Sequence, residues 1–303
     1  MNIPKLLAWF LCLFATGGAL AAPPMAGRET ALLPQEAQAL QPGNAPLKML
    51  VGVNDIYCKD SSCSCIAAIA TRQYAEFCRK LKETYNIELE LVYFLEPYDL
   101  NRAFLAEKFD AILCKPWLVF GHPGGRSEQM LRVADLQDPQ GNTRLWGIVI
   151  VPKNSALKDL GQVAGHRVAY GQSDAYEKHQ CALALFQQQG IKIPADKLVE
   201  KASCLECLDL LMKGSVDAAV ISNYALTADC AVDVTTPDAF RVLGKTEEIP
   251  LTSFMIDLHR VSQDDAYRVQ RALLELSKNG LPSSMSGGGF VQPSSWKIPR
   301  APR

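Results

Sequence analysis

The sequence predicts an α/β protein built from two successive doubly wound sheets. In a first series, three strand-like segments alternate with two helix-like segments, and each spacer is long enough to hold a helix. A second series of the same kind begins near residue 144. A long apolar segment around Trp146 leads out of the first series, and another around Phe254 returns toward it. We therefore expect the chain to cross between the two series twice.

The strands of the first series are short apolar or alternating runs, and its helices carry apolar residues at helical spacing. Residues 47–53 (LKMLVGV) and 87–94 (IELELVYF) are expected strands. Between them we expect a helix at residues 63–84, with Ser62 as its N-cap. A second helix is expected at residues 98–107, and a third strand, buried in the sheet, at residues 109–113.

The third strand belongs to the segment KFDAILCKPWLVF, residues 108–120, which we expect to form one wall of a ligand cleft. The strand is followed at once by Cys114, Lys115, Pro116 and Trp117. In open α/β sheets, ligands bind at the carboxyl ends of the strands, where these residues stand. Lys115 could supply positive charge for an anion, or be a solvated lysine at a strand end. Trp117 could stack on a ligand or belong to the core.

The second series shows the same alternation of strands and helices. Strands are expected at residues 144–151, 167–170, 197–200 and 217–221, and helices at residues 175–189 and 204–213, each followed by a glycine. Residues 250–257 (PLTSFMID) are expected to form a strand that crosses back. Residues 264–278 have the apolar stripe of an amphipathic helix, and a Gly-, Ser- and Pro-rich tail follows from residue 280 and wraps the surface.

Composition fits a globular protein with no polyionic partner. The chain has 303 residues, enough for two domains of roughly 100–150 residues each. Its formal net charge of -1 gives no reason to expect nucleic acid or an anionic membrane as a partner. With four histidines, the chain has little material for a His-built metal or catalytic centre.

The N-terminus has the pattern of a secretory signal peptide. Lys5 precedes a short apolar run at residues 6–14, and small residues lead to Ala-Leu-Ala at residues 19–21. The apolar run is shorter than the roughly 20 residues that a membrane-spanning helix needs. We expect residues 1–21 to be removed on export, and residues 22–46, rich in Ala, Pro and Gln, to form a flexible leader.

Export gives the cysteine count a meaning. The chain has ten cysteines, and Cys12 leaves with the signal peptide. In an oxidising compartment most of the other nine should be paired. Because nine is an odd number, at least one of them is free, ligated or paired with another chain. The second series holds an even four and the first an odd five, so we expect the odd thiol in the first. The disulfide candidates are Cys58, Cys63, Cys65, Cys78, Cys181, Cys204, Cys207 and Cys230.

Two other uses of the cysteines stay open. Soft thiolates select Cu(I) or Zn, and Cys58, Cys63, Cys65 and Cys114 could form a sulfur metal site in the cleft. Cys204 and Cys207 form a C-x-x-C at the start of an expected helix, as redox motifs do, although a structural role is the preferred interpretation.

Five segments in this order resemble the periplasmic substrate-binding components of phosphate, phosphite and phosphonate ABC transporters. The matching segments are GVNDIY, KFDAILCKPWLVF, LWGIVIVPKNSALKDLGQVAGHRVAYG, GSVDAAVISNYAL and EEIPLTSFMI, within residues 47–278. The resemblance implies the two-lobed periplasmic-binding-protein fold, with ligand held between lobes that close on it. Lobe one would comprise residues 47–143 and 250–279, lobe two residues 144–249, and residues 280–303 the C-terminal tail.

The resemblance also implies a set of ligand-binding positions. They are Tyr57, Tyr98, Cys114, Lys115, Trp117, Ser173, Asp174, Ala175, Tyr176, Asn223, Thr252 and Ser253. In the family, a turn at the start of a lobe-two helix holds the oxyanion with backbone amides. Here that turn is SDAYE, in which Asp174 and Glu177 predict a capping box that would use those amides internally.

The expected function is that of an exported, non-enzymatic solute-binding protein that delivers a small polar or oxyanionic ligand to an inner-membrane ABC permease. A monomer without cofactor or nucleic acid is expected. One alternative is a periplasmic cysteine-rich protein that binds a soft metal or acts in thiol redox chemistry. Another is a sensor or accessory binding domain without a transporter. No G-x-S-x-G, H-E-x-x-H, P-loop or Rossmann glycine pattern occurs, and His122, His166, His179 and His259 are scattered.

Overall fold

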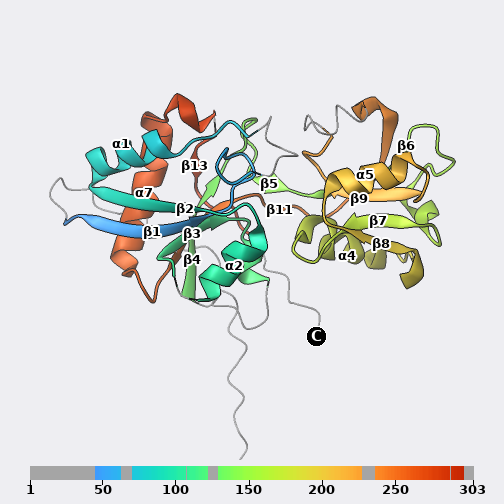
Figure 1. Cartoon of the computed structure of the whole chain (residues 1–303), viewed down its shortest axis with the longest axis horizontal. Coiled ribbons are helices and arrows are strands. Elements are labelled where there is room, and N and C mark those ends of the chain that lie inside the picture. The colour runs from blue at the N-terminus through green and yellow to red at the C-terminus, as the bar shows by residue number, and fades with distance from the viewer. Residues whose placement is uncertain are drawn as a thin grey trace, which may run out of the picture.

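Apolar strands assemble into two separate sheets, one in each of two lobes that lie side by side in Figure 1. The structure is a computed structural model, and it describes residues 45–62, 70–106, 108–121, 129–226, 236–286 and 288–296. The first sheet has six strands in the order β13-β4-β12-β3-β1-β2. Their bounds are β1 Leu47–Val53, β2 Ile87–Tyr93, β3 Ala111–Cys114, β4 Met130–Leu136, β12 Ser253–Asp257 and β13 Phe290–Val291.

In the first sheet, β1 runs parallel to β2 and β3, whereas β12 is antiparallel to β3 and β4. Because side chains alternate between the faces of a strand, Leu113 and Cys114 belong to different apolar clusters. One cluster packs under α1 (Ala75–Tyr85) and α7 (Gln263–Asn279), and the other under α2 (Pro97–Leu105) and α3 (Trp117–Phe120). The first sheet is thus covered on both faces.

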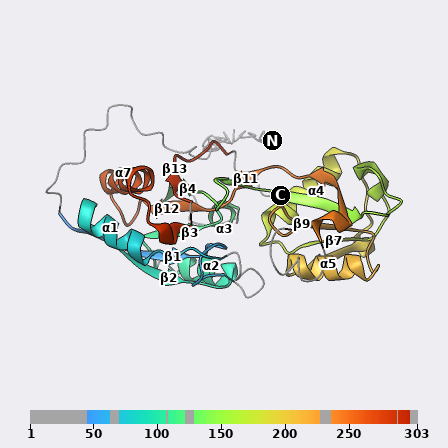
Figure 2. The ribbon, with the colours of Figure 1, turned by 90° about the horizontal axis from the view of Figure 1, so that it is seen from above.

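The second sheet has five strands in the order β10-β6-β9-β7-β8. Their bounds are β6 Gly147–Pro152, β7 Val168–Gly171, β8 Leu198–Lys201, β9 Ala218–Ser222 and β10 Phe240–Lys245. Helix α4 (Gln180–Gln188) and helix α5 (Cys204–Met212) lie on opposite sides of this sheet (Figure 2). Single 3-10 turns are η3 Leu160–Val163, η4 Tyr176–Lys178, η5 Ala195–Lys197 and η6 Pro237–Ala239 in this lobe, and η7 Ser283–Met285 in the other.

Two short strands connect the lobes, as Figure 1 shows between them. β5 (Arg144–Leu145) runs outward and β11 (Ile249–Pro250) returns, and the two pair as an antiparallel ladder. Leu145 and Ile249 are both buried in that ladder. The predicted fold class is therefore confirmed, including the two crossover strands.

Four predicted elements were wrong in extent. The expected strand at 250–257 is divided at residues 251–252 into β11 and β12. Residues 70–74 of the expected helix at 63–84 are not helical, and the first third of that prediction, residues 63–69, lies outside the described residues. The expected helix at 175–189 is interrupted at His179, with η4 before it and α4 after it. The expected strand at 144–151 is divided at Trp146 into β5 and β6. The antiparallel strands β4, β10 and β13 were not predicted.

The non-helical stretch before α1 has a physical cause. The Arg72 guanidinium and the Tyr74 hydroxyl both donate to Asp55 Oδ2, each at 2.7 Å, and Arg72 makes a main-chain bridge to Cys58. Ala70 and Tyr74 are buried because this network packs on the first sheet, so their apolar spacing imitated a helix.

No helix in the described ranges is long and apolar enough to span a membrane.

Candidate functional site

The two lobes meet at a buried cluster of aromatic side chains. Tyr57 follows β1 and Trp117 opens α3 in lobe one, whereas Tyr176 opens η4 in lobe two. The Trp117 and Tyr176 rings stack with centroids 3.5 Å apart and planes 18° from parallel. Trp296 joins from the C-terminal segment and packs edge-on against Phe120. The lobe–lobe contact is therefore an aromatic stack, an arrangement worth about 0.5–1.5 kcal/mol beyond the area it buries.

The sequence after β3 places Lys115 and Trp117 at this contact. β3 ends at Cys114, and Pro116 takes helical backbone angles that begin α3. The Lys115 carbonyl accepts from the Leu118 amide, which closes the first turn. Since proline needs no amide partner at a helix start, this local sequence holds Lys115 at the carboxyl end of the strand.

An ion pair joins the lobes beside the stack. Lys115 Nζ lies 3.3 Å from Glu177 Oε1, and the side chains are 13% and 0% exposed. Ser222, the last residue of β9, donates its hydroxyl to the same Glu177 oxygen at 2.7 Å. Because burial removes water from both charges, the pair depends on these partners to stay ionised.

Acid is expected to weaken this contact. Burial opposes ionisation of Glu177, but Lys115, Lys178 and the Ser222 hydroxyl outweigh it and lower its pKa below the ordinary 4.5. Such a carboxylate contributes stability that is full above about pH 4.5 and is lost as the pH falls through the folded-state pKa. Burial likewise opposes the Lys115 ammonium, yet Glu177 raises the lysine pKa above 10.5, so its contribution is lost only in stronger base.

Thermal unfolding followed from about pH 7 to pH 3 measures this effect. The wild-type protein should lose more stability across that range than the Glu177→Gln variant, which has no carboxylate to protonate. Equal losses in both proteins would show that the Lys115–Glu177 pair contributes nothing to the acid dependence.

A second buried lysine, in the η4 turn next to Glu177, contacts a cysteine. Lys178 is 6% exposed, and its ammonium lies 3.5 Å from the sulfur of Cys204, the first residue of α5. Burial works against the charged form, but Cys204 and Glu177 raise the Lys178 pKa above its ordinary value. The site therefore holds two cations: Lys115 contacts the Glu177 carboxylate, and Lys178 contacts the Cys204 sulfur.

Three buried polar atoms at the lobe–lobe contact have no hydrogen-bond partner among the residues that the structure describes. They are Glu177 Oε2 and the indole nitrogens of Trp117 and Trp296. Buried polar atoms of folded proteins nearly always have a partner. Two indole donors and one carboxylate acceptor could thus be satisfied by a polar solute.

Gly147 at the start of β6 lets the η4 turn reach this position. A Cβ atom on Gly147 would lie 2.5 Å from the Glu177 carbonyl oxygen and 3.1 Å from Thr246 Cγ2. The Thr246 hydroxyl lies between β6 and the η4 turn, where it accepts from the Gly147 amide and donates to the Glu177 carbonyl. Only glycine fits between the strand and the turn.

Gly147→Ala is expected to displace Glu177 from Lys115 and to cost about 1–3 kcal/mol in the free energy of unfolding, because the clash is with backbone. Urea denaturation gives the stability, and titration with a bound anion gives the affinity. Gly161→Ala is the matched control, since its Cβ would meet only the Asp159 side chain, at 3.3 Å. If both variants behave alike, Gly147 does not position the turn.

The structure brings four of the predicted ligand-binding residues together. Tyr57, Trp117 and Tyr176 share the aromatic cluster, and Lys115 pairs across the same contact. Ala175 is buried next to Tyr176, while Ser173 is exposed and Asp174 half-buried on the tight turn before η4. The expected Asp174–Glu177 capping box was wrong: η4 has no side-chain cap, and Glu177 turns inward because Lys115 and Ser222 attract it.

Five other predicted positions make different contacts. Tyr98 is 67% exposed on α2, and Cys114 is buried in the cluster under α2 and α3. Asn223 holds the start of β6 through the Trp146 amide. Ser253 donates to Asp135 inside lobe one, and the Thr252 carbonyl accepts from the Leu136 amide. Their roles in ligand binding stay predictions.

The described cysteines stand as unpaired thiols. These are Cys58, Cys78, Cys114, Cys181, Cys204 and Cys207, whereas Cys63, Cys65 and Cys230 lie outside the described residues. The disulfide pairing therefore stays a prediction. In the described ranges, no three His, Cys, Asp or Glu side chains are grouped to hold a metal ion. The sulfur site with Cys58 and Cys114 needs Cys63 and Cys65 and stays untested.

Sequence reasoning missed the residues that complete the contact. Glu177 was read as a cap, and Lys178, Ser222 and Trp296 were not singled out. Ser222 carried a weak signal, because it directly follows the predicted strand at 217–221, at the carboxyl edge of the second sheet. Lys178 lay inside the predicted helix at 175–189 and carried none. Trp296 gave no signal, since a residue of a Pro- and Ser-rich tail has no periodic context.

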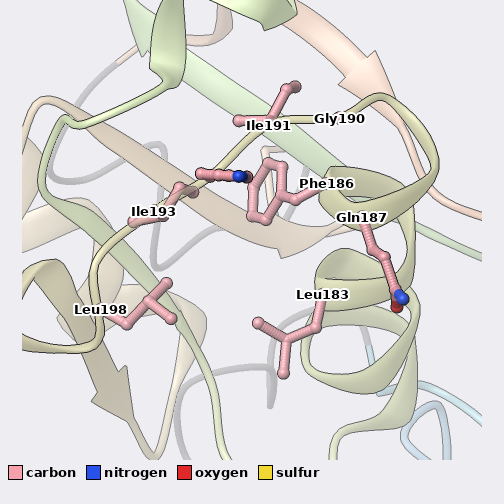
Figure 3. Close-up of a pocket in the computed structure, with 8 residues that line it drawn as sticks. Leu183, Phe186, Gln187, Gly190, Ile191, Ile193 and Leu198 are labelled. Carbon is pink, nitrogen blue, oxygen red and sulfur yellow. The ribbon is translucent and has the colours of Figure 1, made fainter.

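A separate hollow lies in lobe two, between α4 and the segment that follows it (Figure 3). It has a volume of about 350 Å³ and is lined mainly by apolar side chains such as Leu183, Phe186 and Ile193, with Lys192 as its single charged residue. No residue of the lobe–lobe contact lines it. Its chemistry does not suit an oxyanion.

Solved structures share this fold. XAC2383 from Xanthomonas citri bound to ATP has a TM-score of 0.61 at 13% identity, covering 82% of this chain and 91% of that one. PhnD1 from Prochlorococcus marinus in complex with methylphosphonate has a TM-score of 0.57 at 11% identity, covering 84% and 95%. A phosphonate-transporter binding protein from Pseudomonas aeruginosa has a TM-score of 0.53 at 11% identity, covering 82% of each chain. Identities this low show a common fold and nothing about the ligand.

Comparison at the sequence level gives a family. Residues 67–294 match the family described as ABC transporter, phosphonate, periplasmic substrate-binding protein. No curated protein matches the sequence.

Proposed function

Because this chain belongs to the periplasmic substrate-binding proteins of phosphonate ABC transporters, we propose that it captures a small oxyanion between its lobes and delivers it to such a transporter. One observation carries the proposal. Lys115 and Trp117 of lobe one face Tyr176 and Glu177 of lobe two across a buried contact. A solute held there would touch both lobes, so its binding and lobe closure would be coupled.

Lobe closure would turn on the two connecting strands. The proposed moving bodies are residues 47–143 with 250–279, and residues 144–249, and β5 and β11 join them. Hinges of this kind need few residues to absorb the backbone change. The stack and the ion pair would then stabilise the closed form.

Lys115 would supply the charge for the oxyanion, and the indole N–H groups of Trp117 and Trp296 would supply further donors. Charge-assisted hydrogen bonds are roughly twice as strong as neutral ones. Glu177 already holds Lys115, so an incoming anion competes with this carboxylate. Weakly charged solutes would be rejected by that competition, which makes Glu177 a determinant of specificity.

Calorimetric titration with methylphosphonate, phosphite and phosphate tests the ligand class. Methylphosphonate is the first probe because PhnD1 of Prochlorococcus marinus was solved with it. At a ligand concentration of 100 times Kd, thermal unfolding should also show a stabilisation of about 2.7 kcal/mol. If none of the three binds to folded protein, the oxyanion part of the proposal is wrong, and the family membership stands.

The family is one of periplasmic solute-binding proteins, and export of this chain is part of the proposal. Removal of residues 1–21 would leave a mature chain that starts at Ala22. N-terminal sequencing of the exported protein checks this directly. Uptake of the bound solute by cells with and without the gene separates transport from a sensor role. Unchanged uptake would favour the sensor.

A further inference from the structure

Cys204 and Cys207 occupy the first turn of α5, and their surroundings differ sharply. Cys204 is the first residue of the helix after the N-cap Ser203, and it is half-buried. Cys207 is fully buried in the core of lobe two. Ser203 and Glu206 form a capping box that fixes the start of the helix at this place. One thiol can therefore meet a reagent from solution, and the other cannot.

The Lys178 ammonium sits beside the accessible thiol. Its nitrogen lies 3.5 Å from Cys204 Sγ and donates a hydrogen bond to that sulfur. The Ser222 amide also donates to the sulfur, at 3.4 Å. A cation, a backbone donor and a helix N-terminus all favour the thiolate form of a cysteine.

The fold makes room for this lysine. A Cβ atom on Gly171, at the end of β7, would lie 2.4 Å from Lys178 Cγ and 2.7 Å from its Cε. The buried stem of Lys178 thus runs across a strand position that has no side chain. Glycine there lets the ammonium reach Cys204.

We propose that Cys204 and Cys207 form a redox-active dithiol that exchanges with disulfides, with Cys204 as the attacking thiolate and Cys207 as the resolving thiol. Burial raises the pKa of Cys207 to about 12, so this thiol stays protonated until a mixed disulfide forms next to it. The asymmetry matches the two roles. Cys204 borders the Lys115–Glu177 contact through Lys178 and Ser222, but neither thiol contacts Lys115, so the pair adds an activity to the binding function.

The exchange balances in two steps. Cys204 thiolate attacks a disulfide RSSR, forms the mixed disulfide Cys204–S–S–R and releases one thiolate RS⁻. The released RS⁻ takes the Cys207 proton and leaves as RSH, and the Cys207 thiolate attacks the Cys204 sulfur, forms the Cys204–Cys207 disulfide and expels a second RS⁻. The protein loses two electrons, and RSSR becomes two thiols.

The spacing permits this bond with a small adjustment. Residues three apart on a helix have Cβ atoms about 5–6 Å apart. A disulfide needs roughly 3.5–4.5 Å. The first turn must therefore tighten slightly on oxidation. A bond formed with such an adjustment is easier to reduce than an unstrained structural disulfide.

Alkylation of the reduced full-length protein with iodoacetamide at pH 6, read by peptide mass spectrometry, tests the nucleophile. Cys204 should react at least about tenfold faster than the half-buried Cys78, because the Lys178 ammonium and the Ser222 amide contact its sulfur, whereas burial raises the pKa of Cys78 to about 12. Lys178→Met should slow Cys204 by a similar factor. Gly171→Ala keeps the charge but moves the stem, and should slow it as well. Lys213→Met is the matched control, because this exposed lysine lies just past the other end of α5.

The resolving role has its own readout. With oxidised glutathione, Cys207→Ser should trap a mixed disulfide on Cys204, whereas the wild-type protein should lose two hydrogens and form Cys204–Cys207. Reduced glutathione should reverse that bond. The proposal is overturned if Cys204 reacts no faster than Cys78, if Cys204 pairs with another cysteine, or if glutathione cannot reduce the bond. The last outcome would identify a structural disulfide.

Discussion

Replacing Lys115 by methionine is expected to lower the affinity for the bound oxyanion by at least about 100-fold. Truncating one partner of a buried charge pair costs about 2–5 kcal/mol or more in binding, and every 1.4 kcal/mol is a factor of ten. Lys115 is 13% exposed and points at the proposed ligand position, so water replaces little of what is lost. Calorimetric titration with the best of the three anions measures the change.

The same variant should also be less stable, and this second effect needs a control. Without Lys115, the fully buried Glu177 keeps Lys178 as its nearest other cation, which contacts Cys204. Leaving a buried charge uncompensated costs about 3–5 kcal/mol. The double variant Lys115→Met with Glu177→Gln removes both charges and should recover most of the stability. It should still bind the anion poorly. If the double variant binds as tightly as the wild type, Lys115 is not the anion's partner.

Arg72→Met is expected to lower the free energy of unfolding by about 3–5 kcal/mol, because it leaves Asp55 buried and without its cation. Both side chains are at most 1% exposed, and Arg72 Nη1 lies 2.7 Å from Asp55 Oδ2. Tyr74, Ser61 and the Tyr57 amide bond to the same aspartate residue, so the network holds the loop that carries Tyr57. Urea denaturation measures the loss.

Arg79 offers a matched comparison within the same segment. Its guanidinium also lies 2.7 Å from a carboxylate, that of Glu83, but both side chains are more than half exposed. Exposed pairs contribute at most about 1 kcal/mol, so Arg79→Met should change little. The two ion pairs have the same shortest N–O distance and differ in burial. Similar losses for both would show that burial is not what makes the Arg72–Asp55 pair matter.

The fold was largely predictable because its elements carry local patterns. The β1 bounds agree at both ends with the predicted segment, and α5 begins at Cys204, the predicted first residue of that helix. Two of the failures share a cause. Around Arg72 and His179, hydrogen bonds of buried polar groups determine the backbone conformation. The spacing of apolar residues along the sequence does not reveal the partners in those bonds. The unpredicted strands β4, β10 and β13 join their sheets through strand pairing and core packing with segments far away in the sequence.

The candidate site was predictable in part. Tyr57, Lys115 and Trp117 follow strands that end at one edge of a sheet, so strand order alone brings them close. Tyr176 came from the resemblance. The acidic turn beside it was noticed, but its charges were assigned to a cap. In the structure Glu177 pairs with Lys115 instead, since a buried carboxylate needs a cation more than it needs an amide.

By itself, the sequence determined the class of this protein: two α/β series, two crossings and the strand ends at which a ligand would bind. These follow from short-range patterns of side-chain polarity along the chain. The tertiary structure alone decided which charges meet. Lys115 and Glu177 are 62 residues apart, and Lys178 and Cys204 are 26 apart. Contacts at such separations depend on how the sheets pack and on which groups lose their water, and no local pattern records either.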